Sequence, residues 1–183
     1  MNIKAKYSLD DNDYLAYQLY SASTNDWIKT KRKKEWAFTA ITFIVLGMLF
    51  YSNDNIFLGN YFAGAAILTA FCFPFYSRWR YKNHYLRHTR EVHKNSFGKE
   101  VTVTITDSTI EANDYSGQAS INLSQLTEIN ETGQHFFLMT LSGQALIVPK
   151  TKLDNLQGFS STIKELSVNL NIKHNIDNDW KWK

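Results

Sequence analysis

Two long uncharged runs dominate the hydropathy pattern of this 183-residue chain. Eighteen residues without a charged side chain separate Glu35 from Asp54, and 23 separate Asp54 from Arg78. A helix needs roughly 17–25 residues to cross a hydrocarbon core about 30 Å thick. We therefore predict a two-helix transmembrane hairpin. The alternative is a buried hairpin in a soluble core, but so short a chain could not easily cover two helices that are apolar all round.

The apolar positions change to a period of two after residue 99. Residues 101–106 read Val-Thr-Val-Thr-Ile-Thr, which is typical of a half-buried strand. Turn residues separate five further short runs of strand character, at residues 109–113, 118–123, 126–130, 135–141 and 144–148. Pro149 ends the last run because it cannot donate a ladder hydrogen bond. Strands at roughly ten-residue spacing predict an antiparallel meander or barrel.

Segments on either side of the hairpin complete this predicted domain. Residues 3–9 also alternate and would supply the seventh strand that a closed barrel needs. Asp10 or Asp11 would then cap a helix through about Trp27. After the strands, apolar residues recur at intervals of three and four, which predicts a one-sided helix; they are Leu153, Leu156, Phe159, Ile163 and Leu166. The hairpin is therefore expected to be an insertion within one domain.

The expected fold class is α+β, and the chain is expected to have five parts. These are an N-terminal strand and amphipathic helix (1–35), the transmembrane hairpin (36–77), a basic juxtamembrane helix (78–98), a β domain with a capping helix (99–170) and a polar tail (171–183). The tail carries two tryptophans whose rings would touch the membrane interface or a partner, and a frayed end is the simpler expectation.

Positive charge flanks the outer ends of the hairpin, whereas the loop over residues 52–60 contains no Lys or Arg. The positive-inside rule therefore places both termini in the cytoplasm. Aromatic rings at both ends of the spans suit the boundary between lipid and water. The expected interface anchors are Lys33, Lys34, Trp36, Tyr51, Arg78, Trp79 and Arg80.

Small residues four apart in the second span would let helix backbones approach closely. The pairs are Gly59 with Ala63 and Ala66 with Ala70. We expect them to pack the two helices of one chain together. A homo-oligomer built on the same residues is the open alternative.

Candidate chemistry is sparse, and we expect no catalytic, cofactor-binding or metal-binding residues. His84, His88 and His93 have a spacing that could suit a metal, but Lys and Arg around them repel a cation. The lone Cys72 lies in the second run, where a thiolate is disfavoured.

The basic residues after the second span favour anionic lipid over nucleic acid as their partner. Residues 99–170 hold four lysines against eight acids, a net charge of −4. An anionic membrane surface would repel this domain, so we do not expect it to bind lipid headgroups.

Residues 121–159 resemble the C-terminal domain of YcxB-like proteins. The matching features are the strand with Leu126, Ile129 and Glu131, the Phe136-Phe-Leu strand, and an apolar strand ending in Pro149-Lys150 before a helix. The resemblance implies a small bacterial membrane protein with a two-helix hairpin and a pleckstrin-homology-like β-barrel domain. Departures fall at Leu123 and Leu153, where the family tends to carry an aromatic residue.

These observations lead to two functional expectations. The first is a non-enzymatic inner-membrane protein whose cytoplasmic domain mediates interaction with a protein partner. The alternative is an immunity protein that neutralises a pore-forming toxin through contacts of the hairpin within the bilayer. Transport is disfavoured because two spans without an intramembrane charge offer no ion path.

Overall fold

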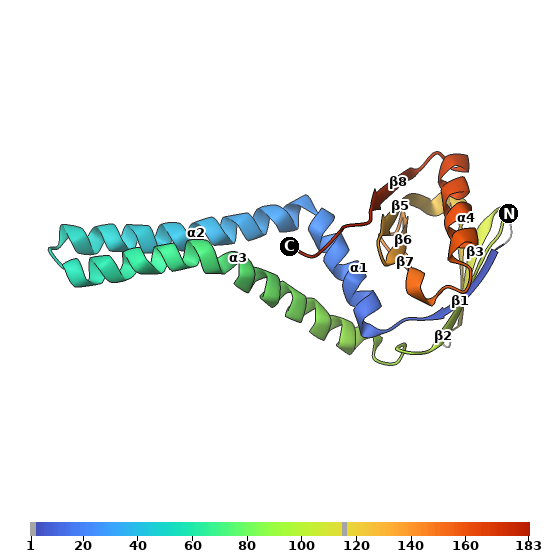
Figure 1. The fold of residues 1–183 in the computed structure, drawn as a ribbon, viewed down its shortest axis with the longest axis horizontal. Coiled ribbons are helices and arrows are strands. Elements are labelled where there is room, and N and C mark those ends of the chain that lie inside the picture. Colours follow the sequence, from blue (N-terminus) through green and yellow to red (C-terminus); the bar gives the residue numbers. More distant parts are fainter. Residues whose placement is uncertain (1–2, 115–116) are drawn as a thin grey trace. The chain divides into compact units, whose positions relative to one another are not determined.

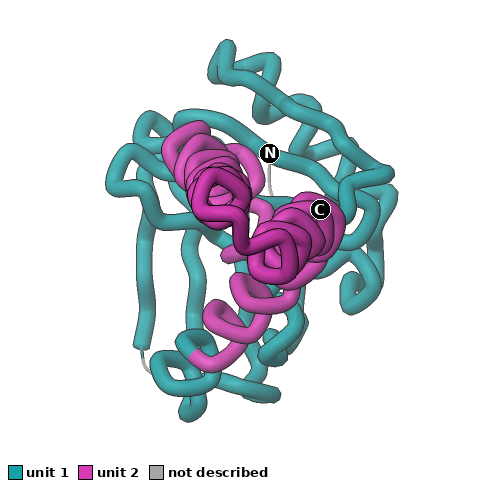
Figure 2. The backbone as a smooth tube through the Cα atoms, turned by 90° about the vertical axis from the view of Figure 1, so that its left-hand side faces the viewer, with its two compact units in different colours: residues 1–17, 88–181 teal, residues 18–87, 182–183 magenta. Residues whose placement is uncertain are grey.

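The computed structural model describes residues 3–114 and 117–183, and the chain divides into two compact units (Figures 1 and 2). The first, here the β unit, comprises residues 1–17 and 88–181. The second, here the helical unit, comprises residues 18–87 and 182–183. The hairpin thus interrupts a unit built from both sides of it in sequence, as the N-terminal alternation predicted.

Helix α1 (Asp11–Thr24) leads into the hairpin, which is formed by α2 (Asp26–Ser52) and α3 (Ile56–His93). Asn25 separates α1 from α2, because its side chain accepts hydrogen bonds from the backbone N–H groups of Trp27 and Ile28. The helix predicted to continue to about Trp27 therefore ends earlier. A short turn with Asp54 at a φ of 56° joins α2 to α3.

Helix α3 continues without interruption past Pro74 to His93. The basic segment predicted as a separate helix over residues 78–98 is therefore the second half of α3, followed by a turn. Both α2 and α3 are long and apolar enough to cross a membrane.

The N-terminal strand belongs to the first of two sheets. This sheet is antiparallel with the order β1 (Ile3–Ser8), β2 (Glu100–Ile105), β3 (Thr109–Asp114) and β4 (Gly117–Asn122). Strand β1 pairs with β2 along its whole length, from Ile3 opposite Ile105 to Ser8 opposite Glu100. The predicted seventh strand is thus confirmed.

The second sheet has the order β7 (Ala145–Pro149), β6 (His135–Thr140), β5 (Leu126–Thr132) and β8 (Lys173–Asp177). Strand β8 runs parallel to β5, with Lys173 opposite Glu128 and Asp177 opposite Thr132. The expectation of a frayed tail over residues 171–183 was therefore wrong for this segment.

Among the described residues, the eight strands form two separate hydrogen-bonded sheets, so the predicted closed barrel was wrong. The short 3₁₀ turn η1 (Leu123–Gln125) carries the chain from one sheet to the other. A second 3₁₀ turn, η2 (Lys150–Lys152), precedes helix α4 (Leu156–Asn169). Helix α4 buries Phe159, Ile163 and Leu166 as its apolar stripe predicted, whereas Leu156 is exposed.

Candidate functional site: the helical hairpin and two buried ionic clusters

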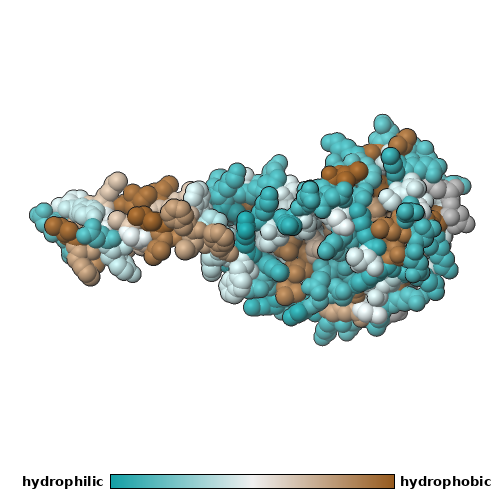
Figure 3. Space-filling view, in the orientation of Figure 1, coloured by the Kyte–Doolittle hydropathy of each residue, from teal (hydrophilic) through white to brown (hydrophobic). Residues whose placement is uncertain are grey.

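The hairpin exposes most of its apolar side chains. Only 6% of the most apolar 18-residue stretch of α2 is buried, and 11% of that of α3. Phe38, Phe57 and Phe71 are each more than 70% exposed. Figure 3 shows hydrophobic residues gathered along both helices of the hairpin. The core helix of a soluble domain would bury this face, so the buried-hairpin alternative does not fit the structure.

Small residues bring α2 and α3 close together near the loop. A Cβ on Gly47 would lie 3.5 Å from the carbonyl oxygen of Gly59 and 3.6 Å from the backbone nitrogen of Ala63. Ala66 is buried and Ala70 is half-buried. Gly47 was not singled out from the sequence, because a lone glycine in an apolar run gives no sign of its neighbour. The close approach is made within one chain.

Aromatic residues pack at both ends of the hairpin. Near the loop, Phe50 stacks on Phe62 with ring centroids 5.3 Å apart, and the Tyr51 hydroxyl donates a hydrogen bond of 2.6 Å to Asn60. At the other end, Trp36 is 40% exposed and Trp79 is 63% exposed. The three aromatic residues proposed as anchors, Trp36, Tyr51 and Trp79, are thus each at least 40% exposed.

An ion pair joins the two helices at their basic end. Arg80 Nη2 lies 2.8 Å from Glu35 Oε2, and the Arg80 guanidinium lies over the rings of Tyr76 and Tyr81. Arg78 lies over the Phe75 ring at 5.7 Å. Of the predicted basic anchors, Lys33 and Lys34 are both exposed, and Lys33 also lines a groove described below.

Arg32 is the centre of this basic end. Its Nε donates to Ser77 Oγ at 3.3 Å, and its Nη2 donates to the carbonyl oxygen of Lys183 at 3.0 Å. Its guanidinium lies 4.8 Å from the centroid of the Trp182 ring. Trp182 Nε1 in turn donates to the carbonyl oxygen of Arg78 at 3.2 Å. Sequence reasoning missed this cluster, because nothing local links residue 32 to residue 182.

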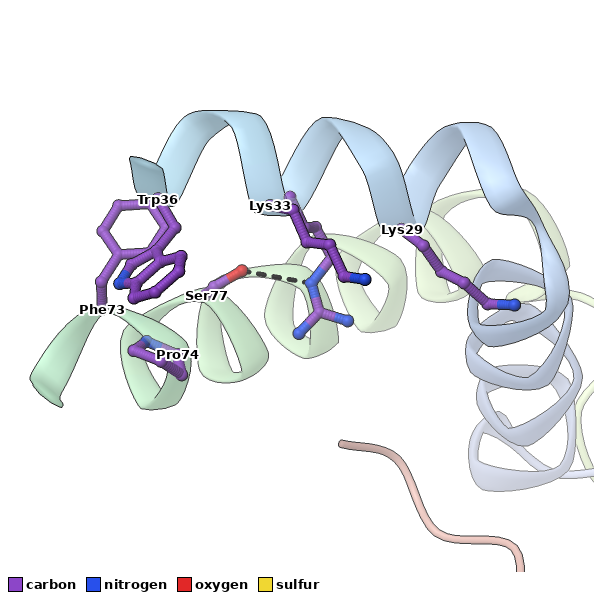
Figure 4. A pocket seen from close by; sticks show the side chains of 7 residues that line it. Lys29, Lys33, Trp36, Phe73, Pro74 and Ser77 are labelled. Atoms are coloured by element: carbon purple, nitrogen blue, oxygen red, sulfur yellow. Dashed lines mark hydrogen bonds between the residues drawn. The ribbon is translucent and has the colours of Figure 1, made fainter. Parts of the chain in front are cut away.

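A groove of about 260 Å³ opens between α2 and α3 beside this cluster (Figure 4). Its lining combines cationic and apolar side chains: Lys29, Arg32, Lys33, Trp36, Phe73, Pro74 and Ser77. Figure 4 shows Trp36, Phe73 and Pro74 gathered at one end, with the two lysines toward the other. The groove is therefore apolar at one end and positively charged at the other.

The Pro149-Lys150 pair lies in the β unit, beside a buried ionic cluster. Pro149 pairs with His135 at the end of β7. Lys150 Nζ lies 2.6 Å from Glu131 Oε1, and His174 Nε2 lies 2.8 Å from the other oxygen of that carboxylate. Each of these side chains is only 12% exposed. The cluster therefore links β8 to β5 and to the turn after β7.

A second buried cluster lies at the start of α1. Asp13 accepts from Lys152 Nζ at 2.6 Å, and its other oxygen lies 2.9 Å from His135 Nε2. The Asp10 backbone N–H also donates to Asp13, and Asp10 itself pairs with Lys152. Burial alone would raise the pKa of Asp13, but the hydrogen bonds from His135 and Lys152 lower it to about 2. Asp13 is therefore a buried carboxylate held in its ionised form.

The described residues contain no group of three His, Cys, Asp or Glu side chains that could hold a metal ion. His93 instead stacks on Tyr14, with ring centroids 4.1 Å apart. The charged side chains of the two ionic clusters pair with one another: Lys150 and His174 with Glu131, and Lys152 and His135 with Asp13.

The structure thus defines an α+β protein with a long, exposed apolar hairpin inserted between the strands of one unit. The family model described as YcxB-like protein matches residues 105–163. This match confirms the resemblance seen in residues 121–159 and identifies a YcxB-like region that runs from the end of β2 into α4. Neither a curated protein nor a solved structure matches the chain.

Proposed function

We propose that this protein is a membrane-anchored adaptor, whose hairpin spans a bacterial inner membrane and whose β unit binds a protein partner in the cytoplasm. The observation that carries the anchoring is the apolar surface of α2 and α3, of which only 6% and 11% of the most apolar 18-residue stretches are buried. Monomeric proteins in water rarely expose an apolar surface of this extent, whereas the hydrocarbon core of a membrane would cover it.

The charge distribution supports the proposed orientation. The loop between α2 and α3 has no Lys or Arg, and the opposite end of the hairpin carries Arg32, Lys33, Arg78 and Arg80. Basic residues stay on the cytoplasmic side during insertion. Both termini, and with them the β unit, would therefore face the cytoplasm.

Protease treatment of membrane vesicles tests this topology. In inside-out vesicles, we expect proteinase K to digest the segments before residue 36 and after residue 77, and to leave a protected fragment containing the hairpin. In right-side-out vesicles, only the loop over residues 52–60 would be accessible. A β unit protected in inside-out vesicles would contradict the orientation. Recovery of the intact chain in the soluble fraction without detergent would contradict anchoring itself.

The protein-binding role is proposed for the exposed edge of the first sheet. The two sheets and the C-terminal helix α4 support a pleckstrin-homology-like arrangement, although the sheets do not close. Strand β4 lies at a sheet edge with five of its six residues exposed. An unpaired edge can accept an extended segment of another chain. Beside it, a cleft of about 300 Å³ lined by residues of β1, β4 and β7 would receive side chains from that segment.

A photo-crosslinking amino acid placed at position 118 tests the edge as the binding surface. Gln118 is exposed on β4, and Lys164 is exposed on α4 and serves as a matched position away from the edge. We expect a discrete crosslinked product in cells from position 118 and none from position 164. The same product from both positions would indicate random collision and contradict an edge-specific partner.

A further inference from the structure

We propose that the groove between α2 and α3 is a binding site for one anionic phospholipid, with the phosphate at its cationic end and an acyl chain at its apolar end. The proposal rests on the membrane anchoring proposed above and goes beyond it, because it assigns one lipid class to one site. General attraction of basic residues to a membrane surface requires no such groove.

The cationic end is built by the helical spacing of α2. Lys29, Arg32 and Lys33 lie three and four residues apart, and Trp36 follows one turn later, so all four project to the same face. The groove lining includes no acidic residue. Lys29 pairs with the exposed Asp26 at 3.0 Å, whereas no Asp or Glu side chain among the described residues pairs with Arg32 or Lys33. The groove therefore carries uncompensated positive charge.

Arg32 is already oriented to receive a phosphate oxygen. Ser77, which is buried, fixes Nε, and the Trp182 ring covers one face of the guanidinium plane. The in-plane Nη1 hydrogens have no acceptor within the described part of the chain, and Nη2 donates only to the carbonyl oxygen of Lys183. A planar guanidinium with free in-plane donors binds phosphate through paired hydrogen bonds.

The apolar end distinguishes a lipid from a soluble anion. Trp36, Phe73 and Pro74 form this end and offer no hydrogen-bonding group to a sugar or a free phosphate, apart from the Trp36 ring N–H. They do offer surface to a hydrocarbon chain. Trp36 lies at the start of the apolar run of α2, at the level where lipid headgroups would meet the protein. A ligand with a phosphate and a hydrocarbon chain uses both ends of the groove.

Trp36 supplies the signal for the test. The full chain is reconstituted in phosphatidylcholine nanodiscs of two kinds. One contains phosphatidylglycerol with brominated acyl chains, and the other contains phosphatidylcholine with brominated acyl chains at the same mole fraction. Bromine quenches tryptophan fluorescence at short range, and subtraction of a Trp36→Phe variant isolates the Trp36 signal from the other four tryptophans. We expect brominated phosphatidylglycerol to quench Trp36 more strongly than brominated phosphatidylcholine.

Two double variants separate the site from diffuse attraction. Lys29→Gln/Lys33→Gln should lower the relative binding constant for phosphatidylglycerol by about tenfold. Lys34→Gln/Lys82→Gln removes the same charge from exposed positions of α2 and α3 outside the groove, and should change it by about twofold at most. Equal losses in both variants would overturn the site.

Two further outcomes bear on the proposal without any variant. Equal quenching of the unmodified protein by both brominated lipids would overturn the site and leave the anchoring intact, because the protein would still be embedded in the nanodisc. Competition by glycerol phosphate in solution at the concentration of the lipid would show that the headgroup alone is bound, which overturns the role of the apolar end. No competition is expected.

Discussion

Deletion of residues 1–9 is expected to unfold the β unit, although these residues precede the hairpin and the rest of that unit follows it. Strand β1 pairs with β2 along six residues, and Ala5, Tyr7 and Leu9, which follows the strand, are buried. Burial of Tyr7 and Leu9 alone contributes roughly 3–6 kcal/mol. That is a large part of the 5–15 kcal/mol that typically stabilises a domain.

Tyr7 also connects the two sheets directly. Its hydroxyl donates a 2.9 Å hydrogen bond to the carbonyl oxygen of Ile147 in β7, and burial raises the pKa of this hydroxyl above its usual range. Without β1, the buried face of β2 around Val103 and Ile105 would meet water. The loss of β1 therefore removes a sheet edge and the contact between the sheets at once.

Hydrogen exchange of the full chain in detergent measures the effect segment by segment. In the deletion variant we expect β2 and β6 to lose protection, while the apolar parts of α2 and α3 keep it. The control is Lys4→Ala/Lys6→Ala, which changes only exposed side chains of β1 and should leave protection unchanged. Full protection of β2 after the deletion would contradict the pairing of β1 with it.

Features of this fold that depend on neighbours in sequence could be predicted from the sequence. The alternation over residues 101–106 identified β2 almost to the residue, because one face of that strand is buried and the other is not. The uncharged runs likewise identified the apolar parts of α2 and α3. Even β1 could be predicted, since its alternation is local, although its partner lies beyond the hairpin.

Features that depend on distant pairing could not be predicted in the same way. Strand β8 reads Lys-His-Asn-Ile-Asp and has no apolar face, so its hydropathy indicates a tail. Its attachment to β5 relies on polar side chains: His174 contacts Glu131, and Asn175 donates to Asn130. Barrel closure was mispredicted for a related reason, because strand count alone does not determine which edges pair.

Only part of the candidate site could be predicted from the sequence. The charged and aromatic residues at the ends of the hairpin are apparent from the sequence itself. The groove was not, because it requires Lys29 and Arg32 of α2 to face Phe73 and Ser77 of α3, and that alignment depends on how the two helices pack. Gly47, which permits the close approach, has no signature of its own in the sequence.

Replacement of Asp13 by alanine is expected to destabilise the β unit by about 3–5 kcal/mol, the range observed when one member of a buried ion pair is removed. The side chains of Asp13 and His135 are each only 8% exposed, and Lys152 shares the same carboxylate. The variant would leave the buried His135 ring without its carboxylate partner and Lys152 with Asp10 as its remaining partner. It would also remove the acceptor of the Asp10 N–H at the start of α1.

Asp11 provides the matched control two residues away. Its ion pair with Arg90 is exposed at the arginine, so Asp11→Ala should cost less than about 1 kcal/mol. Thermal unfolding of the full chain in detergent, followed by circular dichroism, compares the two variants. Equal loss of stability in both would contradict the role of burial. A Lys152→Met change added to Asp13→Ala should cost less than the sum of the single changes, because the two residues share one interaction.

Acid titration provides an independent reading of the same carboxylate. The pKa of Asp13 is lowered from 3.8 to about 2 on folding, so its ionised form stabilises the folded state at every pH above about 4. This contribution, about 2 kcal/mol, is lost as the pH falls from about 4 to about 2, because the unfolded chain takes up the proton first. The free energy of unfolding should therefore change more with pH across this range for the unmodified chain than for Asp13→Asn, which has no proton to bind there. Parallel pH dependences for the two proteins would mean that the Asp13 carboxylate is not held ionised by Lys152 and His135.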